Sequence, residues 1–315
     1  DTACSSSLVA IAEACNSLLL GDCDLALAGG ACVLIGPSMF IDTAKVGMLS
    51  KDGRCFTFDA RANGFVPGEG VGVLLLKRLE DALNDGDPVR AVIRGWGTNQ
   101  DGRTNGITAP NPQAQTRLMQ SVHRKFGIDP ASIGLIECHG TGTALGDPIE
   151  IEGLCDAFAG SGLQEGAAVI GSVKANVGHL LASAGVAGAM KAMLALEQAE
   201  LPPAVNFQTL NPHIRLTGAP FRVNSSLKPW PAGSTPRRAA VSSFGFSGTN
   251  AHLVLEEAPV LSSGTGAPGP YLFVLSARDR DRLIEYAAVM ERFIAADPAL
   301  DLGDLAYTLR VARSA

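Results

Sequence analysis

Short apolar runs that alternate with amphipathic helical patterns are the feature of this sequence that most restricts its fold. The 36 glycines and many alanines and valines lie among these runs. An alternation of this kind is typical of an α/β domain whose strands are buried. The runs predict strands over Asp24–Gly30, Gly72–Leu76, Val89–Gly95, Ile133–Cys138, Val169–Val173 and Ala251–Leu255.

The segments between these runs predict helices over Ser6–Leu20, Pro112–Phe126, Pro148–Phe158 and Leu180–Glu197. Gly21 and Gly127 are suited to end the first two, since glycine readily adopts the left-handed conformation that closes many helices. We expect Asp147 to cap the third helix, with Pro148 in the first helical position and Glu150 in an acidic first turn.

The helix over residues 180–197 differs from the others because its residues are apolar or small on every side. We therefore expect it to be buried all round. Gly185 and Gly188 each destabilise a helix by about 1 kcal/mol relative to alanine. Close packing against another backbone is the expected compensation.

The composition changes after Glu257. Residues 259–270 are rich in proline, glycine and serine, which predicts a surface linker. Residues 271–315 then begin a second unit, with a strand expected over Tyr271–Leu275 and helices over Asp279–Ala295 and Leu302–Arg313. About 45 residues are too few for an independent core, so we expect this unit to be truncated or to pack against the main domain.

Charge and hydropathy argue against several classes of partner. The formal net charge is −6, and basic residues form only pairs such as Arg237-Arg238, so we expect no nucleic acid partner. No stretch of 18 or more apolar residues runs without glycine, serine or charge, and no basic region followed by a hydrophobic one opens the sequence, which predicts a soluble, cytoplasmic protein. The 7 cysteines include no C-x-x-C pair, so we expect them to be reduced, with all but one serving as small buried apolar residues.

Cys4 is the exception because it lies among small residues immediately before a helical pattern, in the segment DTACSSS. Small neighbours allow the sharp turn of a nucleophile elbow. The free N–H groups and positive end of a following helix favour thiolate over thiol and can hold an oxyanion. Taken alone, the segment would favour a buried structural cysteine, as for the other cysteines.

Two histidines follow buried strands in a similar way. His139 lies in ECHGTGT after one predicted strand, and His179 closes KANVGH after another. A polar, glycine-rich loop at the end of a buried strand has no evident structural purpose, so the two histidines together favour a catalytic interpretation. We expect the remaining histidines to be ordinary hydrogen-bonded side chains: His123 on an exposed-looking helix, His213 in a loop and His252 at the start of a strand.

DTACSSS, HGTGT with its GDPIE continuation, KANVGH and SSFGFSGTNAH occur in this order. Their sequences and spacing resemble β-ketoacyl synthases, most closely the ketosynthase domains of modular type I polyketide synthases. The resemblance covers residues 1–258 and implies a thiolase-like α/β fold, layered α/β/α/β/α. In the family roughly as much chain again precedes the nucleophile, which implies that the N-terminal half of the fold is missing from this chain. Residues 271–315 resemble the start of the adapter that follows such domains.

The resemblance implies a decarboxylative condensation. Cys4 would take an acyl group from the phosphopantetheine arm of an acyl carrier protein, and His139 and His179 would stabilise the enolate formed from a malonyl-type unit. The N–H groups of Cys4 and Phe246 match the family's oxyanion hole. Acyl carrier protein domains, an acyltransferase in cis or in trans and a second copy of the chain are the implied partners, with no cofactor bound directly.

Further residues match supporting positions of the family. Lys174 and Glu150 match a charged pair near the histidines, where each would offset the other's burial. Thr141 and Thr143 match hydroxyls that bind the pantetheine arm. Phe246 also matches an aromatic gate over the acyl site.

Other interpretations remain open. A non-elongating ketosynthase would pass acyl chains on without condensation, and both histidines disfavour it. A Cys/His hydrolase would need one histidine as a general base, and no orienting Asn or Asp pattern lies nearby. An inert fragment is the third possibility. The histidine spacing is unlike a zinc site and the glycine-rich loops lack the dinucleotide fingerprint, so we expect neither a metal nor a nicotinamide cofactor.

Overall fold

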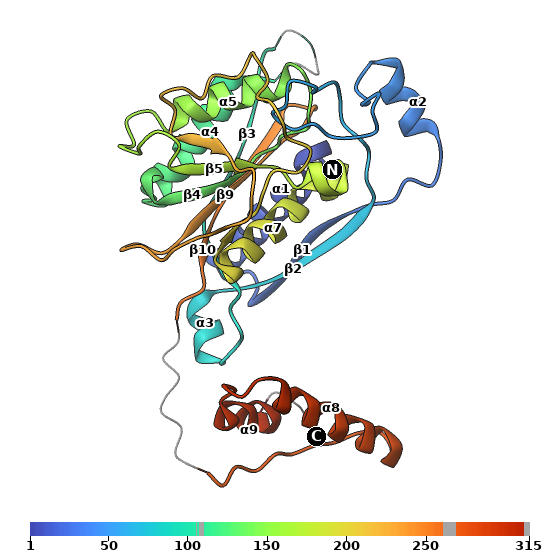
Figure 1. The fold of residues 1–315 in the computed structure, drawn as a ribbon, viewed down its shortest axis with the longest axis vertical. Helices are drawn as coiled ribbons and strands as arrows, with labels where there is room; N and C mark the ends of the chain where they lie inside the picture. The colour runs from blue at the N-terminus through green and yellow to red at the C-terminus, as the bar shows by residue number, and fades with distance from the viewer. Residues whose placement is uncertain (105, 107–109, 261–268, 312–315) are drawn as a thin grey trace. The chain divides into compact units, whose positions relative to one another are not determined.

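The computed structural model describes residues 1–104, 106, 110–260 and 269–311. It contains two compact units, residues 1–259 and residues 260–315, which we treat separately. The first unit is built on a six-stranded mixed sheet (Figure 1). Its strands, from one edge to the other, are β3 (Ala91–Gln100), β10 (Thr249–Glu257), β9 (Arg238–Phe244), β4 (Ile133–Glu137), β5 (Ala168–Gly171) and β7 (Phe221–Val223).

The central strands of this sheet are buried on both faces. β9, β4, β5 and β7 are parallel, whereas β10 is antiparallel to both of its neighbours. Alternate residues enter different cores: Leu135 and Val241 enter one, and Ile136 and Ala240 enter the other. Side chains of successive strand residues point to opposite faces, so continuous apolar runs such as IGLIE suit a sheet that is covered on both sides.

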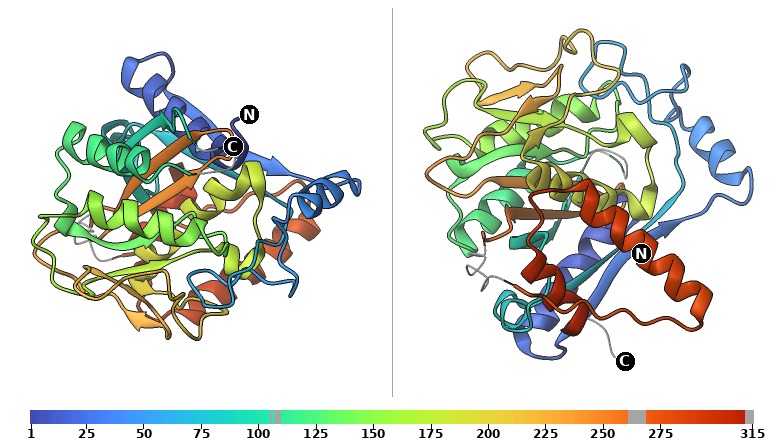
Figure 2. Two further views of the ribbon diagram at one scale, coloured as in Figure 1. Left: turned by 90° about the horizontal axis from the view of Figure 1, so that it is seen from above. Right: turned by 60° about the horizontal axis from the view of Figure 1, so that its bottom comes forward.

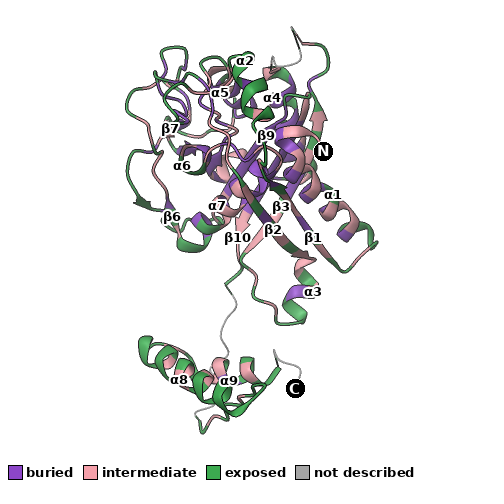
Figure 3. Ribbon diagram, turned by 90° about the vertical axis from the view of Figure 1, so that its right-hand side faces the viewer, coloured by how far each residue is buried: buried purple, intermediate pink, exposed green. Residues whose placement is uncertain are grey.

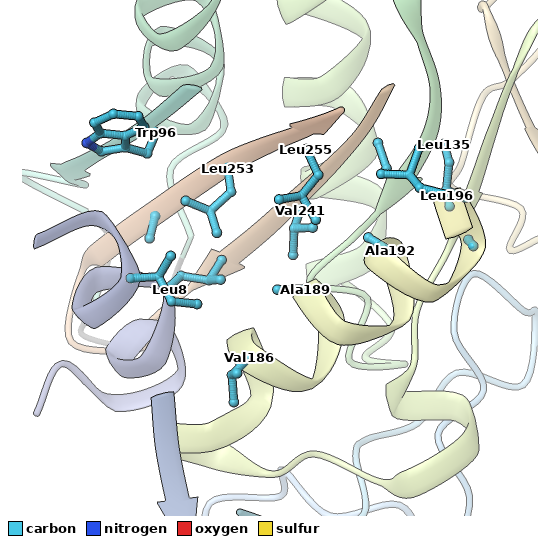
Figure 4. Packing of buried hydrophobic residues seen from close by; sticks show 14 of the residues in the cluster. Leu8, Trp96, Leu135, Val186, Ala189, Ala192, Leu196, Val241, Leu253 and Leu255 are labelled. Atoms are coloured by element: carbon cyan, nitrogen blue, oxygen red, sulfur yellow. The ribbon is translucent and has the colours of Figure 1, made fainter. Parts of the chain in front are cut away.

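Helices cover both faces of the sheet. α1 (Ser6–Leu20) and α7 (Ala184–Gln198) lie side by side on one face, and α4 (Pro112–Lys125) and α5 (Gly146–Ala157) lie on the other (Figures 1 and 2). Figure 4 shows Leu8 and the apolar side of α7 packing against β9 and β10. The predicted α/β class and the four predicted helices are therefore confirmed, with end shifts of a few residues.

The burial of α7 is less complete than its composition predicts. A short 3-10 turn, η3 (Leu181–Ser183), precedes it, and Leu194 on the helix is 46% exposed. The two glycines do permit close packing, but against side chains: a Cβ on Gly185 would lie 2.5 Å from Leu8 Cγ, and one on Gly188 would lie 3.1 Å from Glu137 Cγ. The expectation of contact with another backbone was wrong in that respect.

A separate two-stranded sheet joins β1 (Leu25–Cys32) to β2 (Gly70–Lys77). One of its faces packs on α1 and α7, while Leu27, Val71 and Leu75 on the other face are more than half exposed. Figure 3 shows exposed and partly exposed residues along both strands. The remaining elements of this unit are η1 (Ala3–Ser5), α2 (Ser38–Lys45), α3 (Leu79–Asn84), η2 (Pro130–Ser132), α6 (Lys174–Val177), β6 (Glu200–Leu201) and β8 (Lys228–Pro229).

The predictions for this unit missed strands of the sheet and were wrong about one helix cap. β9 was not predicted, because its sequence RAAVSSF mixes small and hydroxyl residues that give no apolar run. α5 begins at Gly146 and its N-cap, Leu145, makes no side-chain cap. Asp147 does not cap the helix, because its carboxylate accepts hydrogen bonds from the N–H groups of Phe58 and Gly142 instead.

The second unit contains α8 (Arg280–Ala296) and α9 (Leu302–Val311). The first matches its predicted range, and the end of the second predicted helix lies outside the described residues. Asp279 caps α8 by accepting a hydrogen bond from the N–H of Arg282. The strand predicted over Tyr271–Leu275 is not formed: within residues 269–311 the unit supplies no second strand to complete a ladder, and a lone strand is not stable.

One described helical segment, Ala3–Leu20, is long and apolar enough to span a membrane when judged by length and composition alone. Its mean hydropathy is 1.4 over 18 residues. Leu8 and Ile11 of this segment belong to the hydrophobic core of the first unit.

Two histidines outside the strand-end loops are buried, contrary to the exposed position expected for His123. His123 on α4 and His252 within β10 are 5% and 0% exposed, with ring centroids 5.8 Å apart. Ser242 Oγ lies 2.9 Å from Nδ1 of His252, but both ring nitrogens of His123 lack a hydrogen-bond partner among the described residues. Burial lowers the pKa of His123 to about 4 and that of His252 to about 3.

This burial predicts acid sensitivity. The unfolded chain protonates each histidine near its ordinary pKa of about 6.5, whereas the folded protein keeps both neutral to lower pH. Stability is therefore lost as the pH falls below about 6.5, by about 2 kcal/mol per histidine between pH 7 and pH 5. We therefore compare the free energy of unfolding at pH 7 and pH 5 by denaturant titration of the full-length protein. Between these pH values it should fall by about 2 kcal/mol less in His123→Leu than in wild type. The exposed His213→Gln is the control, and an equal loss in wild type and His123→Leu would contradict the prediction.

Candidate active site

Cys4 lies in a tight turn before α1, as the sequence predicted. Cys4 is part of η1, which leads directly into α1. Ala3 adopts a φ of 57°, in the left-handed region that alanine rarely occupies. Asp1 holds this turn by accepting hydrogen bonds from the N–H of Ala3 and the hydroxyl of Ser6. The thiol is thus presented on a strained backbone turn, and Cys4 is only 8% exposed.

The turn after β9 packs closely against the backbone that precedes Cys4. A Cβ on Gly245 would lie 2.5 Å from the carbonyl oxygen of Thr2, so only glycine fits this approach without movement. The next residue, Phe246, directs its backbone N–H toward the sulfur of Cys4, whose own N–H acts in the same way. Both N–H groups assigned to an oxyanion hole therefore lie at Cys4, while the Phe246 side chain is 50% exposed.

His179 approaches the same sulfur from the end of β5 and α6. Its Nε2 lies 3.2 Å from Sγ of Cys4, and its Nδ1 accepts a hydrogen bond from the N–H of Leu181. The backbone of His179 is held by Val66 and Gly68, which accept from its N–H and donate to its carbonyl. His179 is 1% exposed, so the surrounding residues hold its ring in one position.

His139 arrives from the neighbouring strand, two residues after β4 ends. Its ring centroid lies 5.6 Å from that of His179, with the two planes nearly perpendicular. Its Nδ1 accepts a hydrogen bond from the N–H of Phe244, 3.3 Å away. Because β4 and β5 are parallel neighbours, their carboxyl ends deliver both histidines to one edge of the sheet.

These hydrogen bonds determine which ring nitrogen carries the hydrogen. Each Nδ1 accepts from a backbone N–H, so in the neutral ring the hydrogen resides on Nε2. Both Nε2–H groups are then donors, and with Cys4 Sγ the three side chains place one atom each within 4.8 Å of one another. A metal-bound histidine normally donates its other N–H to an acceptor. The arrangement therefore suits a negatively charged oxygen better than a metal ion.

Burial controls the protonation of this site. It raises the pKa of the Cys4 thiol, while the N–H of Phe246, the charge of Lys174 and the N–H of Cys4 act in the opposite direction. The expectation that the start of the helix would leave a resting thiolate was wrong, because burial outweighs it. Burial and the charge of Lys174 also lower the pKa values of His139 and His179 well below their usual range, so both rings are neutral at physiological pH.

Comparison with known proteins agrees with this geometry. Residues 1–82 match the model of the β-ketoacyl synthase N-terminal domain, residues 90–208 match that of its C-terminal domain, and residues 211–314 match the ketoacyl-synthetase C-terminal extension. The chain belongs to the β-ketoacyl synthase family. Its α/β architecture is accordingly the thiolase-like fold of ketosynthases.

Curated relatives of this ketosynthase chain are polyketide synthases. It is 47% identical over 319 residues to polyketide synthase PksL of Bacillus subtilis, covering 100% of the chain and 7% of the relative. It is 48% identical over 313 residues to a phenolphthiocerol/phthiocerol polyketide synthase of Mycobacterium tuberculosis, covering 98% of the chain and 17% of the relative.

Solved ketosynthases share the fold closely. The ketosynthase from module 6 of the bacillaene synthase of Bacillus subtilis superposes with a TM-score of 0.89 at 47% identity, covering 100% of this chain and 55% of that one. The oxazolomycin ketosynthase domain of Streptomyces albus gives a TM-score of 0.88 at 43% identity, covering 99% and 55%. This chain thus spans about half the length of the solved ketosynthases that it matches.

Two buried carboxylates of α5 shape the loop that carries His139 in this ketosynthase. Glu150 accepts hydrogen bonds from the N–H groups of His139 and Gly140, at 2.6 and 2.7 Å. Asp147 holds Gly142 of the same loop, a role that the sequence-based predictions did not include. The signal was available, because residues three apart on a helix share one face and both carboxylates belong to GDPIE.

Lys174 lies at the start of α6 and is 3% exposed. Its charge acts on Cys4 and both histidines. The charge of Lys174 also acts on Glu150 and lowers its pKa, although burial outweighs this effect. Within the described residues Lys174 makes no salt bridge, because Glu150 is turned to the backbone of the His139 loop. Thr141 and Thr143 face each other with hydroxyl oxygens 3.3 Å apart, and both are partly exposed.

Removing the Glu150 carboxylate should destabilise the full-length ketosynthase. Burial raises the pKa of Glu150 to about 7, and either protonation state retains acceptors for the two loop N–H groups. Glu150→Ala leaves both donors unsatisfied, at about 1–3 kcal/mol each. We expect a loss of about 2–6 kcal/mol in the free energy of unfolding for Glu150→Ala and about half of that for Glu150→Gln, measured by chemical denaturation. The exposed Glu152→Ala on the same helix is the control, and a Glu150→Ala variant as stable as this control would contradict the assignment.

Proposed function

We propose that this chain carries the catalytic residues of a β-ketoacyl-[acyl carrier protein] synthase that extends polyketide chains by decarboxylative condensation. The observation that carries the proposal is that one ring nitrogen each of His139 and His179 and the sulfur of Cys4 lie within 4.8 Å of one another, while both Nδ1 atoms accept from backbone N–H groups. An acyl transfer needs the thiol but no enolate stabilisation, whereas two neighbouring donors suit an oxygen that becomes negatively charged.

In the first step the Cys4 sulfur attacks an acyl thioester presented on a phosphopantetheine arm. The carbon–sulfur bond to pantetheine breaks, an acyl-Cys4 thioester forms, and the thiol proton ends on the released pantetheine sulfur. The N–H groups of Cys4 and Phe246 hold the tetrahedral oxyanion. Lys174 and Nε2–H of His179 stabilise the thiolate as it forms, which offsets the effect of burial on the pKa of Cys4.

In the second step a carrier-bound malonyl-type unit loses carbon dioxide, and the electron pair of the broken bond forms an enolate. Nε2–H of His139 and of His179 donate to its oxygen. The enolate carbon attacks the acyl-Cys4 carbonyl, the bond to Cys4 breaks, and the β-ketoacyl chain remains on the carrier. Stabilisation is greatest when the charge has developed, as catalysis requires.

The remaining assignments follow the same scheme. Thr141 and Thr143 would bind the pantetheine arm through their adjacent hydroxyls, and the Phe246 side chain would gate the acyl site. Carrier protein domains and an acyltransferase, in cis or in trans, would supply the substrates. Association of two copies and a cytoplasmic location remain predictions.

A Cys/His hydrolase is disfavoured by the hydrogen bonds of the histidines. A general base needs a lone pair facing its target, but Nδ1 of each ring is occupied by a backbone N–H and Nε2 carries the hydrogen. A non-elongating ketosynthase, which only transfers acyl chains, remains the alternative within the family.

The proposal is tested by supplying the full-length protein with an acyl carrier thioester and then a malonyl carrier thioester. Mass spectrometry should find the β-ketoacyl chain on the second carrier. Recovery of the unextended acyl chain on that carrier, with no β-keto product, would favour the transacylating alternative and reject elongation.

A further inference from the structure

Glu137 is a buried carboxylate next to the site for which the reaction scheme has no role. It is the last residue of β4 and is 1% exposed. Its Oε1 accepts a hydrogen bond from the N–H of Val173, and its Oε2 lies 2.6 Å from Nζ of Lys191 on α7. One side chain thus joins the strand that leads to His139, the residue before Lys174, and the helix that follows His179.

The surrounding backbone is shaped to admit this ion pair. A Cβ on Gly188 of α7 would lie 3.1 Å from Glu137 Cγ, and a Cβ on Gly171 of β5 would lie 3.4 Å from Lys191 Nζ. Glu137 and Gly171 are also direct neighbours in the β4–β5 register. The two glycines therefore leave space for the charged groups on both sides, and the pair lies between strand ends and helix rather than at the surface.

Stability alone does not account for such a pair. Desolvating two charges costs about as much as their attraction returns, and an apolar pair of similar volume is often as stable or more stable. A directional ion pair can instead fix how the end of a strand and a helix are placed relative to each other. Such placement matters where two donors must reach one oxygen. A misplacement of about 1 Å at a catalytic group can reduce a rate by about 10²-fold.

We propose that Glu137 and Lys191 form a positioning pair that holds His139, Lys174 and His179 in the geometry needed for decarboxylation. The proposal rests on the proposed function. Acyl loading depends on Cys4 and on the N–H of Phe246, which belong to other elements, and uses Lys174 and His179 only to stabilise the forming thiolate, whereas decarboxylation needs both histidine donors at one oxygen. Disturbing the pair should therefore slow decarboxylation selectively and leave loading of Cys4 nearly unchanged.

The test uses the double variant Glu137→Met/Lys191→Met in the full-length protein, because a neutral apolar pair keeps the volume and avoids a lone buried charge. We expect carbon dioxide release from a malonyl carrier to fall about 10- to 100-fold, with acyl loading of Cys4 within about 3-fold of wild type. The thermal midpoint should fall only modestly, because the Val173 N–H loses its acceptor. Lys191→Arg, which keeps the charge, should retain most of the decarboxylation rate.

The exposed pair Arg90 and Glu197 provides a matched control on the same helix, so Glu197→Gln should change neither rate. A wild-type decarboxylation rate in the double variant would overturn the positioning role, as would an equal loss of loading and decarboxylation, which indicates general unfolding. Absence of decarboxylation in the wild type would instead reject the proposed function itself, so the two failures are distinguishable.

Discussion

Cys4→Ala abolishes acyl loading in our account, because no other group at the site can form the thioester. We expect the rate of acyl transfer to the full-length protein to fall by about 10⁴-fold or more, as it does when a catalytic nucleophile is removed. The measurement is the mass increase of the intact protein after incubation with an acyl carrier thioester.

Buried cysteines elsewhere provide the control for this experiment. Cys138 and Cys15 are also buried, and burial raises the pKa of each thiol, but neither is paired with a histidine among the described residues. Cys15→Ala should load acyl groups at the wild-type rate. Loading that persists in Cys4→Ala would show that the nucleophile is another residue.

His139→Ala should separate the two halves of the reaction. The ring lies beside His179 and is not the group in contact with the sulfur, so acyl loading of Cys4 should stay within a few-fold of wild type. Losing one of two donors to the enolate oxygen should reduce condensation by about 10²–10³-fold. Both rates can be measured on one preparation, by mass spectrometry for loading and by β-ketoacyl formation for condensation.

A conservative variant sharpens this prediction. His139→Asn retains an N–H donor on a shorter side chain and should recover part of the condensation rate lost in His139→Ala. A His139→Ala protein that condenses at the wild-type rate would refute the role assigned to this ring. So would a parallel loss of loading and condensation, since that pattern would place His139 in the acylation step.

Much of the fold could be predicted because its signals are local. Apolar runs identified β4 and β5, and helix-ending glycines marked α1 and α4. β9 was missed because a strand of small and hydroxyl residues becomes recognisable only when its neighbours β4 and β10 pair with it. The strand predicted over residues 271–275 was wrong for the opposite reason. Its apolar sequence suits a strand, but the described part of its unit offers no partner strand.

The site shows the same division between local and tertiary information. The motifs around Cys4, His139 and His179 predicted which residues meet. The donors that set the histidine tautomers, the N–H groups of Leu181 and Phe244, carry no side-chain signal. The pKa of Cys4 depends on burial by the whole fold, which is why the start of a helix alone suggested a resting thiolate.

The most direct test of the account follows acyl-Cys4 after loading. A protein preloaded on Cys4 is mixed with a malonyl carrier, and carbon dioxide release and loss of the acyl chain are measured together. We expect one carbon dioxide for each acyl chain that leaves Cys4, with both at the same rate. Departure of the acyl chain without carbon dioxide would contradict condensation by the converging Nε2–H donors.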